Sequence, residues 1–132
     1  SWVESMLGGE PPRLGHTTLQ AMQREGVSSA WWWASAAVVV VLAPLAEETI
    51  HRGFLQQALK GALRSRGLAI AGTSFMFALL HWGALPDGAR VAGLTTLCLF
   101  SVMLGYLYER TGRLSMCVAT HALFNAINLA RL

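Results

Sequence analysis

Four long runs of apolar residues occupy most of the chain after residue 30. They comprise residues 31–46, 68–85, 91–108 and 114–130. Each run holds about 16–18 residues, close to the lower end of the range of about 17–25 that a membrane-spanning helix needs. Backbone groups in lipid can bond only to one another, so spanning segments are helices or closed barrels, and unbroken apolar runs favour helices. The pattern predicts an all-α, polytopic membrane bundle of about four transmembrane helices.

The first of these helices is expected to continue well past residue 46. Apolar residues recur at helical spacing as far as Ala62. An apolar stripe with polar side chains beside it is typical of an amphipathic helix. We interpret this part as an amphipathic extension that leads out of the bilayer to a turn at residues 64–67. The polar side chains beside its apolar face are Arg52, Gln56, Lys60 and Arg64.

Residues 1–29 are the most polar part of the chain and are broken by glycine and proline pairs. Residues 17–20 (TTLQ) have the form of a capping box, and Gly26 can end a short helix. We therefore expect two parts in the chain. The first is a loop with a short surface helix at residues 1–29, and the second is a membrane core at residues 30–132.

The composition supports a membrane protein. Hydrophobic residues make up 54% of the 132 residues and charged residues only 13%, whereas a soluble domain carries about 25% charged residues. The net charge of +3 is scattered along the chain and forms no basic stripe, so a nucleic-acid partner is not expected.

The loop charges bear on the orientation in the membrane. With four crossings, the first and third joins share one face, which holds five basic residues against four on the other face. The positive-inside rule favours a cytoplasmic location for these two joins. The five basic residues are Lys60, Arg64, Arg66, Arg110 and Arg113.

Two acids stand inside the first helix. An acid at the centre of a spanning helix costs about 2.5–3.5 kcal/mol on insertion scales. Glu47 and Glu48 follow the first apolar run, and Arg52 comes four residues after Glu48. This spacing predicts an ion pair between Glu48 and Arg52, while Glu47 points about 100° away and is left free. The alternative places both acids among headgroups at a helix end, but the apolar face resumes after them.

Polar residues also line one face of the second helix and one face of the fourth. Both faces are expected to point inward. Asn in lipid must find partners, and for Asn128 we expect a hydrogen bond between helices. The two faces consist of Thr73, Ser74, Phe77 and His81 in the second run, and of His121, Asn125 and Asn128 in the fourth.

A hairpin of the first two helices would bring some of these groups to one level. Glu47 and His81 each lie 17 residues from Arg64. His121 follows the third join by about nine residues, or roughly 13 Å, and reaches the same level if the first hairpin protrudes past the membrane surface. We expect the acid, the two histidines and Asn125 to converge in a cavity.

These residue types suit the attack of water on a carbonyl group. A carboxylate beside a histidine can hold a water molecule and take its proton. A second histidine with an Asn amide can donate hydrogen bonds to a developing oxyanion. The chain has no Gly-rich phosphate loop, no G-x-S-x-G elbow and no H-E-x-x-H helix.

Three segments resemble the motifs of one family, in the same order and each on a separate apolar run. Residues 47–53 (EETIHRG) resemble its EExxxRG motif, residues 77–81 (FALLH) its FxxxH motif, and residues 121–125 (HALFN) its HxxxN motif. The family is the CAAX-protease and bacteriocin-processing group of intramembrane peptidases. One of its members cuts the last three residues from prenylated proteins.

The resemblance implies a role for each matching residue. His51 departs from the family, because an aromatic residue is common at its position. We interpret His51 as a surface histidine near the interface; the alternative is a hydrogen bond to Glu47 or a metal ligand. By resemblance, Glu47 and His81 would activate water, His121 and Asn125 would stabilise the oxyanion, and Glu48 with Arg52 would support the site.

Zinc is an open alternative for this site. Glu47, His81 and His121 could supply one carboxylate and two histidines, leaving a fourth position for water. In that case His121 would present a neutral nitrogen to the ion, whereas an oxyanion donor must present an N–H group. The Asn125 amide one turn later favours the metal-free route.

The expected function is that of an intramembrane endopeptidase, either metal- or glutamate-dependent, acting near the surface of a bacterial plasma membrane. Its substrate would be a peptide or a lipidated protein, as in CAAX-type C-terminal processing. The alternatives are a non-catalytic membrane protein of the same family, with an immunity or scaffold role, and a proton or metal conduit. A conduit needs polar groups through the full membrane depth, whereas these gather in one layer.

Overall fold

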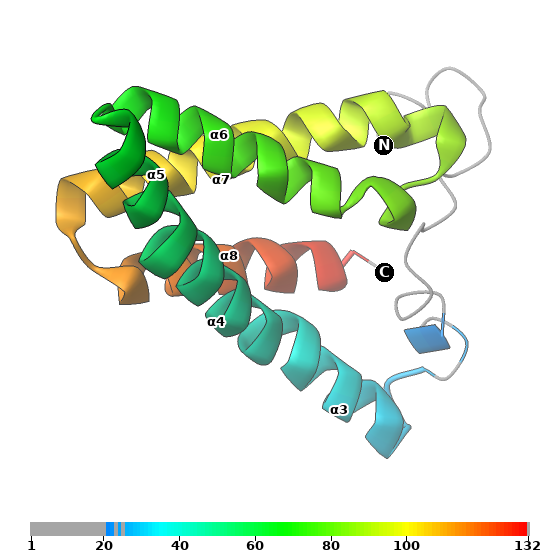
Figure 1. Cartoon of the computed structure of the whole chain (residues 1–132). Helices are drawn as coiled ribbons and strands as arrows, with labels where there is room; N and C mark the ends of the chain where they lie inside the picture. Colours follow the sequence, from blue (N-terminus) through cyan, green and yellow to red (C-terminus); the bar gives the residue numbers. More distant parts are fainter. Residues whose placement is uncertain (1–20, 23, 25, 132) are drawn as a thin grey trace.

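Every regular element is a helix in the part of the chain that the computed structural model describes, residues 21–131 apart from 23 and 25 (Figure 1). The first helix is continuous from Ala30 to Leu63. Its five segments are α3 (Ala30–Ala37), η1 (Val38–Leu42), α4 (Ala43–Glu48), η2 (Thr49–Leu55) and α5 (Gln56–Leu63). After it come α6 (Arg66–Leu80), the short turns η3 (Trp82–Ala84) and η4 (Asp87–Ala89), α7 (Arg90–Thr111) and α8 (Leu114–Leu129). The predicted all-α bundle and the long first helix are confirmed.

The predicted surface helix lies mostly outside the described residues, and its capping box at residues 17–20 lies wholly outside them. Ala21, Met22 and Arg24 are helical. Gly26 has φ +72° and donates its N–H to the Met22 carbonyl at 3.1 Å. A left-handed glycine that closes the last turn is a common helix end, so Gly26 ends this turn as predicted. The division into residues 1–29 and 30–132 stays a prediction.

Within the part of the chain that the structure describes, three helices are long and apolar enough to cross a membrane: Ala30–Leu63, Arg66–Ala84 and Asp87–Thr111. The fourth, α8, is apolar but has only 16 residues. Large apolar side chains are exposed over the surface, such as Phe54 at 70%, Leu80 at 73% and Val91 at 80%. Water would penalise so many exposed apolar groups, whereas lipid solvates them.

The first hairpin turns where the sequence predicts it. Arg64 has a left-handed backbone (φ 50°) and ends α5. Ser65 then caps α6, because its hydroxyl accepts a hydrogen bond from the Leu68 N–H. The turn after α7 is similar, since Gly112 has φ 63° and donates its N–H to the Tyr108 carbonyl.

Two segments of the first helix have wide π turns, η1 and η2, and α4 lies between them. Pro44 near the start of α4 explains the first, because proline has no N–H and its ring clashes with the carbonyl four residues earlier. The Ala43 N–H reaches back five residues to the Val38 carbonyl. Wide turns inside helices often mark functional sites, and here they flank both acids.

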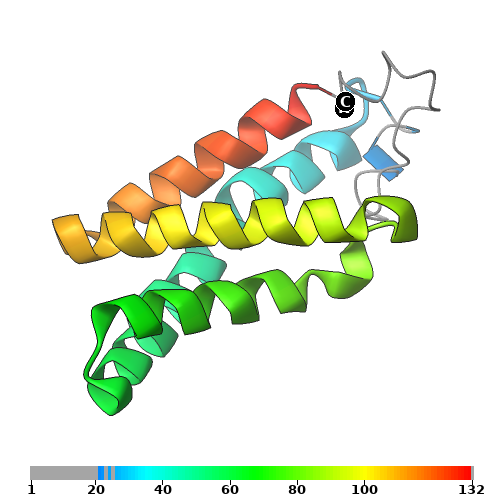
Figure 2. The same ribbon diagram turned by 90° about the horizontal axis from the view of Figure 1, so that it is seen from above.

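The long helix crosses the other three described helices, and two of the three turns between them, α5–α6 and α7–α8, lie at one end of the molecule. Helix α6 packs against α5 and α7, while α8 packs against α7, α4 and η1. Figures 1 and 2 show the α5–α6 turn and the α7–α8 turn at the left, and the end of α8 at the right. The five basic residues of the two joins therefore gather at one end. Which side of the membrane this end faces stays a prediction.

Candidate active site

A buried ion pair within the first helix forms the centre of the candidate site. Glu48 and Arg52 are both fully buried. Arg52 Nε lies 3.1 Å from Glu48 Oε2, and Arg52 Nη1 donates to Glu48 Oε1 at 3.1 Å. The pair predicted from the spacing is confirmed. The Nη1–Oε1 contact is a hydrogen bond, whereas Nε and Oε2 face each other as an ion pair without one.

The third guanidinium nitrogen bonds to α7. Arg52 Nη2 donates to the Ser101 carbonyl at 2.9 Å and to the Ser101 hydroxyl at 2.7 Å. Ser101 is itself fully buried. Buried charges are tolerated when they are paired and their remaining polar atoms are hydrogen-bonded. Ser101 provides that compensation for the side of Arg52 that Glu48 does not reach.

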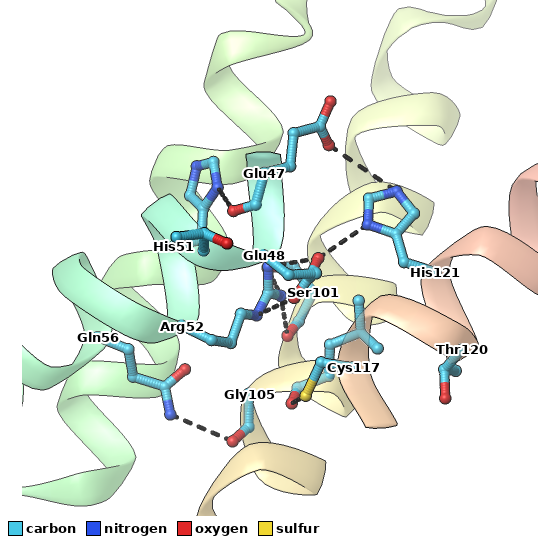
Figure 3. Close-up of polar contacts among 12 residues, drawn as sticks. Glu47, Glu48, His51, Arg52, Gln56, Ser101, Gly105, Cys117, Thr120 and His121 are labelled. Atoms are coloured by element: carbon cyan, nitrogen blue, oxygen red, sulfur yellow. Dashed lines mark hydrogen bonds and ion pairs between the residues drawn. The ribbon is translucent and has the colours of Figure 1, made fainter. Parts of the chain in front are cut away.

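His121 approaches the same carboxylate from α8 (Figure 3). Its Nδ1 lies 2.8 Å from Glu48 Oε1. A carboxylate paired with arginine can only accept, so Nδ1 carries a proton. The other ring nitrogen, Nε2, lies 3.8 Å from Glu47 Oε2. Glu48 therefore orients the ring, and Nε2 is the nitrogen that faces Glu47.

The two neighbouring acids have different surroundings. The Glu48 side chain is fully buried, whereas that of Glu47 is 32% exposed. Glu47 reaches toward His121 and away from Arg52, as Figure 3 shows and as the helix spacing predicts. The 3.8 Å separation exceeds a hydrogen bond. Glu47 and His121 thus face a shared space at the edge of the buried cluster.

Phe77 on α6 is the point around which the histidines gather. Its ring is fully buried, and the Arg52 guanidinium lies 5.5 Å from its centre. The centres of the His51, His81 and His121 rings lie 5.1, 4.7 and 6.0 Å from it. Three histidines from three separate helices therefore border one aromatic ring.

The hairpin register is the one that the sequence predicts. His51 and Phe77 each lie 13 residues from Arg64, and their rings are in contact. The half-buried His81 donates from Nδ1 to the Phe77 carbonyl at 2.8 Å. Among the described residues, however, no contact joins His81 to Glu47. The predicted joint action of Glu47 and His81 on a water molecule therefore rests on their common level in the hairpin and stays a prediction.

His51 is not at the surface, so the interpretation as an interfacial histidine is wrong. The residue is 5% exposed and lies against Phe77. Its Nδ1 lies 2.7 Å from the carbonyl oxygen of Glu47 and donates to it. The alternative prediction, a hydrogen bond to Glu47, is closer to the structure, although the acceptor is the backbone carbonyl and not the carboxylate.

The two asparagines of α8 differ from expectation in their partners. Asn125 donates from Nδ2 to the carbonyl of Val39 at 2.8 Å, which ties α8 to the wide turn η1. Asn128 was expected to bond between helices, and this is wrong: it is exposed and donates to the Phe124 carbonyl of its own helix. An asparagine near a helix end can find an acceptor on the preceding turn.

A row of polar contacts between the first helix and α7 was not foreseen. The extension was expected to carry its polar face out of the bilayer, but Arg52 and Gln56 are fully buried against α7. The partners are Arg52 with Ser101, Gln56 with the Gly105 carbonyl, and Lys60 with Glu109. Each pair is separated by 49 residues. The constant offset shows that the two helices run parallel. The sequence signal for these contacts was the recurrence of the contacting residues every four positions in both helices.

The predicted zinc ligands do not assemble into a three-ligand site. Among the residues that the structure describes, no group of three His, Cys, Asp or Glu side chains is placed to hold a metal ion. Glu47 and His121 come close together, but His81 bonds to the Phe77 carbonyl and no third ligand joins them. These residues therefore do not provide the ligand set of a catalytic zinc.

Comparison with known proteins identifies a family for the chain. The family model described as "Type II CAAX prenyl endopeptidase Rce1-like" matches residues 29–127. Neither the curated proteins nor the solved structures contain a significant match to the chain. The matched region includes all three motifs, the buried ion pair and the α7 contacts. The chain therefore belongs to the Rce1-like family of type II CAAX prenyl endopeptidases.

Proposed function

We propose that this chain is an intramembrane endopeptidase that hydrolyses a peptide bond near the membrane surface, with Glu47 as the base. One observation carries the proposal: Glu47 faces His121 Nε2 at 3.8 Å, and the fully buried Glu48 holds His121 in that orientation. A half-exposed carboxylate beside a fixed histidine can bind a water molecule and take its proton.

The reaction follows from these groups. Glu47 takes a proton from water while the water oxygen bonds to the peptide carbonyl carbon, and the electrons of the C=O double bond move to oxygen. The oxyanion electrons then re-form the C=O double bond as the C–N bond breaks, and Glu47 returns the proton to the departing amine. His81 would help to place the water. The reaction conserves atoms and charge and needs no further reactant.

The oxyanion would be stabilised by His121 and Asn125. His121 Nδ1–H already donates to Glu48, so Nε2 can donate only from the doubly protonated ring. Asn125 uses one of its two amide hydrogens on the Val39 carbonyl, and the other can serve the oxyanion. Donors placed where negative charge develops typically contribute about 10²–10³-fold in rate.

A lipidated peptide is the substrate class that we propose. The family description refers to prenyl endopeptidases. An apolar hollow of about 930 Å³ lies between α3, η1 and the end of α8, within the usual size of a ligand pocket. Its lining includes Val40 and Ala126, which adjoin the Asn125–Val39 contact. An apolar chain in this hollow would place an attached peptide near the site. By resemblance to the family, we place the protein in a bacterial plasma membrane.

The proposal is tested by cleavage of prenylated and unprenylated peptides by the purified protein in lipid. Glu47→Gln keeps the size and polarity of the side chain but removes the base, so the rate should fall by roughly 10²–10⁴-fold. Asp87→Asn, in an exposed turn, is the matched control and should keep the parental rate.

Two results would contradict the proposal. Cleavage by Glu47→Gln at the parental rate would remove Glu47 from the mechanism. A folded parent protein that binds peptide without cutting it would favour the non-catalytic role. Bound zinc is measured in the same preparation, and zinc whose removal abolishes cleavage and whose return restores it would overturn the metal-free route.

A further inference from the structure

We propose that Ser101 is a positioning residue of the site, which fixes the His121 ring through Arg52 and Glu48. The inference rests on the proposed function, in which the ring nitrogen facing Glu47 matters. Ser101 lies on α7, outside all three motifs, and touches none of the groups that we place at the reacting bond. Its influence must pass through its neighbours.

The connection is a chain of short contacts between buried groups. The Ser101 hydroxyl accepts from Arg52 Nη2 at 2.7 Å, Arg52 Nη1 donates to Glu48 Oε1 at 3.1 Å, and the same Oε1 accepts from His121 Nδ1 at 2.8 Å. The side chains of Glu48, Arg52 and Ser101 are fully buried. Each of the three contacts joins two side chains directly.

The guanidinium of Arg52 is held on two sides. Glu48 Oε1 accepts from Nη1 and Glu48 Oε2 forms an ion pair with Nε, while the carbonyl and the hydroxyl of Ser101 both accept from Nη2. A planar group held at both ends cannot rotate, so it presents a fixed edge to the carboxylate. Without the hydroxyl, one end keeps only the carbonyl, and the plane of Arg52 can tilt together with Glu48.

His121 would feel that movement directly. Its Nδ1 bond to Glu48 decides which ring nitrogen faces Glu47. A displaced Glu48 oxygen loosens this choice and lets the ring adopt other orientations. Misplacement of a catalytic group by about 1 Å can cost about 10²-fold in rate. Ser101 therefore acts on turnover, and substrate affinity should change little.

The α7 contacts below Ser101 explain why this hydroxyl can hold Arg52 in place. Gly105 and Glu109 follow it at intervals of four residues and bond to Gln56 and Lys60. Three ties at a constant offset prevent α7 from sliding along the first helix. Ser101 is the tie nearest to the catalytic groups.

The test compares Ser101→Ala and Ser101→Cys with the parent protein in lipid. Cysteine keeps the volume but is a weak acceptor, so it provides a folded comparison if alanine does not. In each variant that folds, kcat should fall about tenfold while KM stays within twofold. Thr95→Ala, an exposed hydroxyl on the same helix that bonds only to the Val91 carbonyl, should match the parent.

A second readout does not depend on activity. Nitrogen NMR of ¹⁵N-histidine-labelled protein should show His121 protonated at Nδ1 in the parent, and additional His121 signals in the Ser101 variants. His121→Asn identifies the resonance. A variant with parental kcat and parental His121 signals would overturn the inference. If the parent cleaves nothing, the proposed function fails, yet the NMR comparison still decides whether Ser101 positions the ring.

Discussion

Two polar clusters join the first helix to α7, and they differ mainly in their contact with solvent. The inner cluster consists of Glu48, Arg52, Ser101 and His121, whose side chains are at most 6% exposed. The outer cluster consists of Gln56, Lys60, Arg66 and Glu109. Each contains one acid that interacts with two basic side chains. In the outer cluster, however, Lys60 is 36% and Arg66 is 78% exposed.

The difference in solvent exposure gives the two clusters different expected roles. In the inner cluster, water cannot replace a hydrogen-bond partner that is lost, so each group depends on the geometry of the others. In the outer cluster water can replace a lost partner, and an exposed ion pair contributes little. The inner cluster also contacts Glu47, whereas the outer one lies at the end of the molecule where the turns are. Similar chemistry therefore orients a site in one place and fastens helices in the other.

The largest effect is expected from Glu48→Gln. The change leaves Arg52 buried without its counter-charge, and breaking a buried pair in this way costs about 3–5 kcal/mol. Thermal unfolding in detergent and the yield of folded protein would measure it. Glu47→Gln, one residue earlier and half exposed, should unfold like the parent. Equal stability of the two variants would mean that burial does not distinguish the two acids.

An intermediate effect is expected from Gly105→Ala, at the boundary between the clusters. The new Cβ would lie 2.9 Å from Gln56 Oε1 and 3.1 Å from Ile70 Cγ2. Both neighbours are packed between helices, so overpacking should cost about 1–3 kcal/mol.

The matched control for this change is Gly61→Ala in α5. A Cβ added at Gly61 would meet no neighbouring side chain within 4 Å among the residues that the structure describes. The alanine should stabilise the helix by about 0.5–1 kcal/mol. The two substitutions should thus shift the unfolding temperature in opposite directions. A shift of the same sign for both would refute the close approach of α7.

The smallest effect is expected from Lys60→Ala in the outer cluster. Lys60 Nζ lies 3.1 Å from both oxygens of Glu109, but its side chain is 36% exposed, and Gln56 and Arg66 still contact the acid. The loss should be below about 1 kcal/mol and should shrink further in high salt. A loss as large as that of Glu48→Gln would show that the outer cluster is not solvated.

Local patterns in the sequence were sufficient to predict the helices, their turns and the Glu48–Arg52 ion pair. Unbroken apolar runs predict helices in lipid, because a helix satisfies its own backbone groups and a barrel strand would alternate apolar and polar residues. Arg64 and Gly112 lie where those runs are interrupted, and both adopt the left-handed backbone of a helix end. The Glu48–Arg52 pair needs only a spacing of four residues. The convergence of Glu47 with His121 required a further assumption, namely that the first hairpin protrudes past the membrane surface.

The remaining features depend on contacts between segments far apart in the chain. Ser101 resembles any small residue in an apolar run until Arg52 is placed opposite it. His51 was assigned to the surface because its helix was expected to leave the bilayer, whereas α6 covers that face with Phe77. The partner of Asn125 is a backbone carbonyl in a wide turn; Pro44 marks the interruption of the helix, but it does not indicate which distant side chain bonds to the free carbonyl.

The wide turn at residues 38–42 lets the start of the long helix accommodate the loss of one residue. A π turn contains about one residue more than an α turn, and such turns are stable as single interruptions of an α-helix. Loss of one valine from the run of four would close the turn to an α turn, and the tryptophan-rich start of α3 would still face the same way relative to the acids. Loss of one residue elsewhere between the tryptophans and the acids would instead rotate that start by about 100°. All three motifs would remain intact in both chains, so the position of a deletion, and not its length, decides where the tryptophans lie.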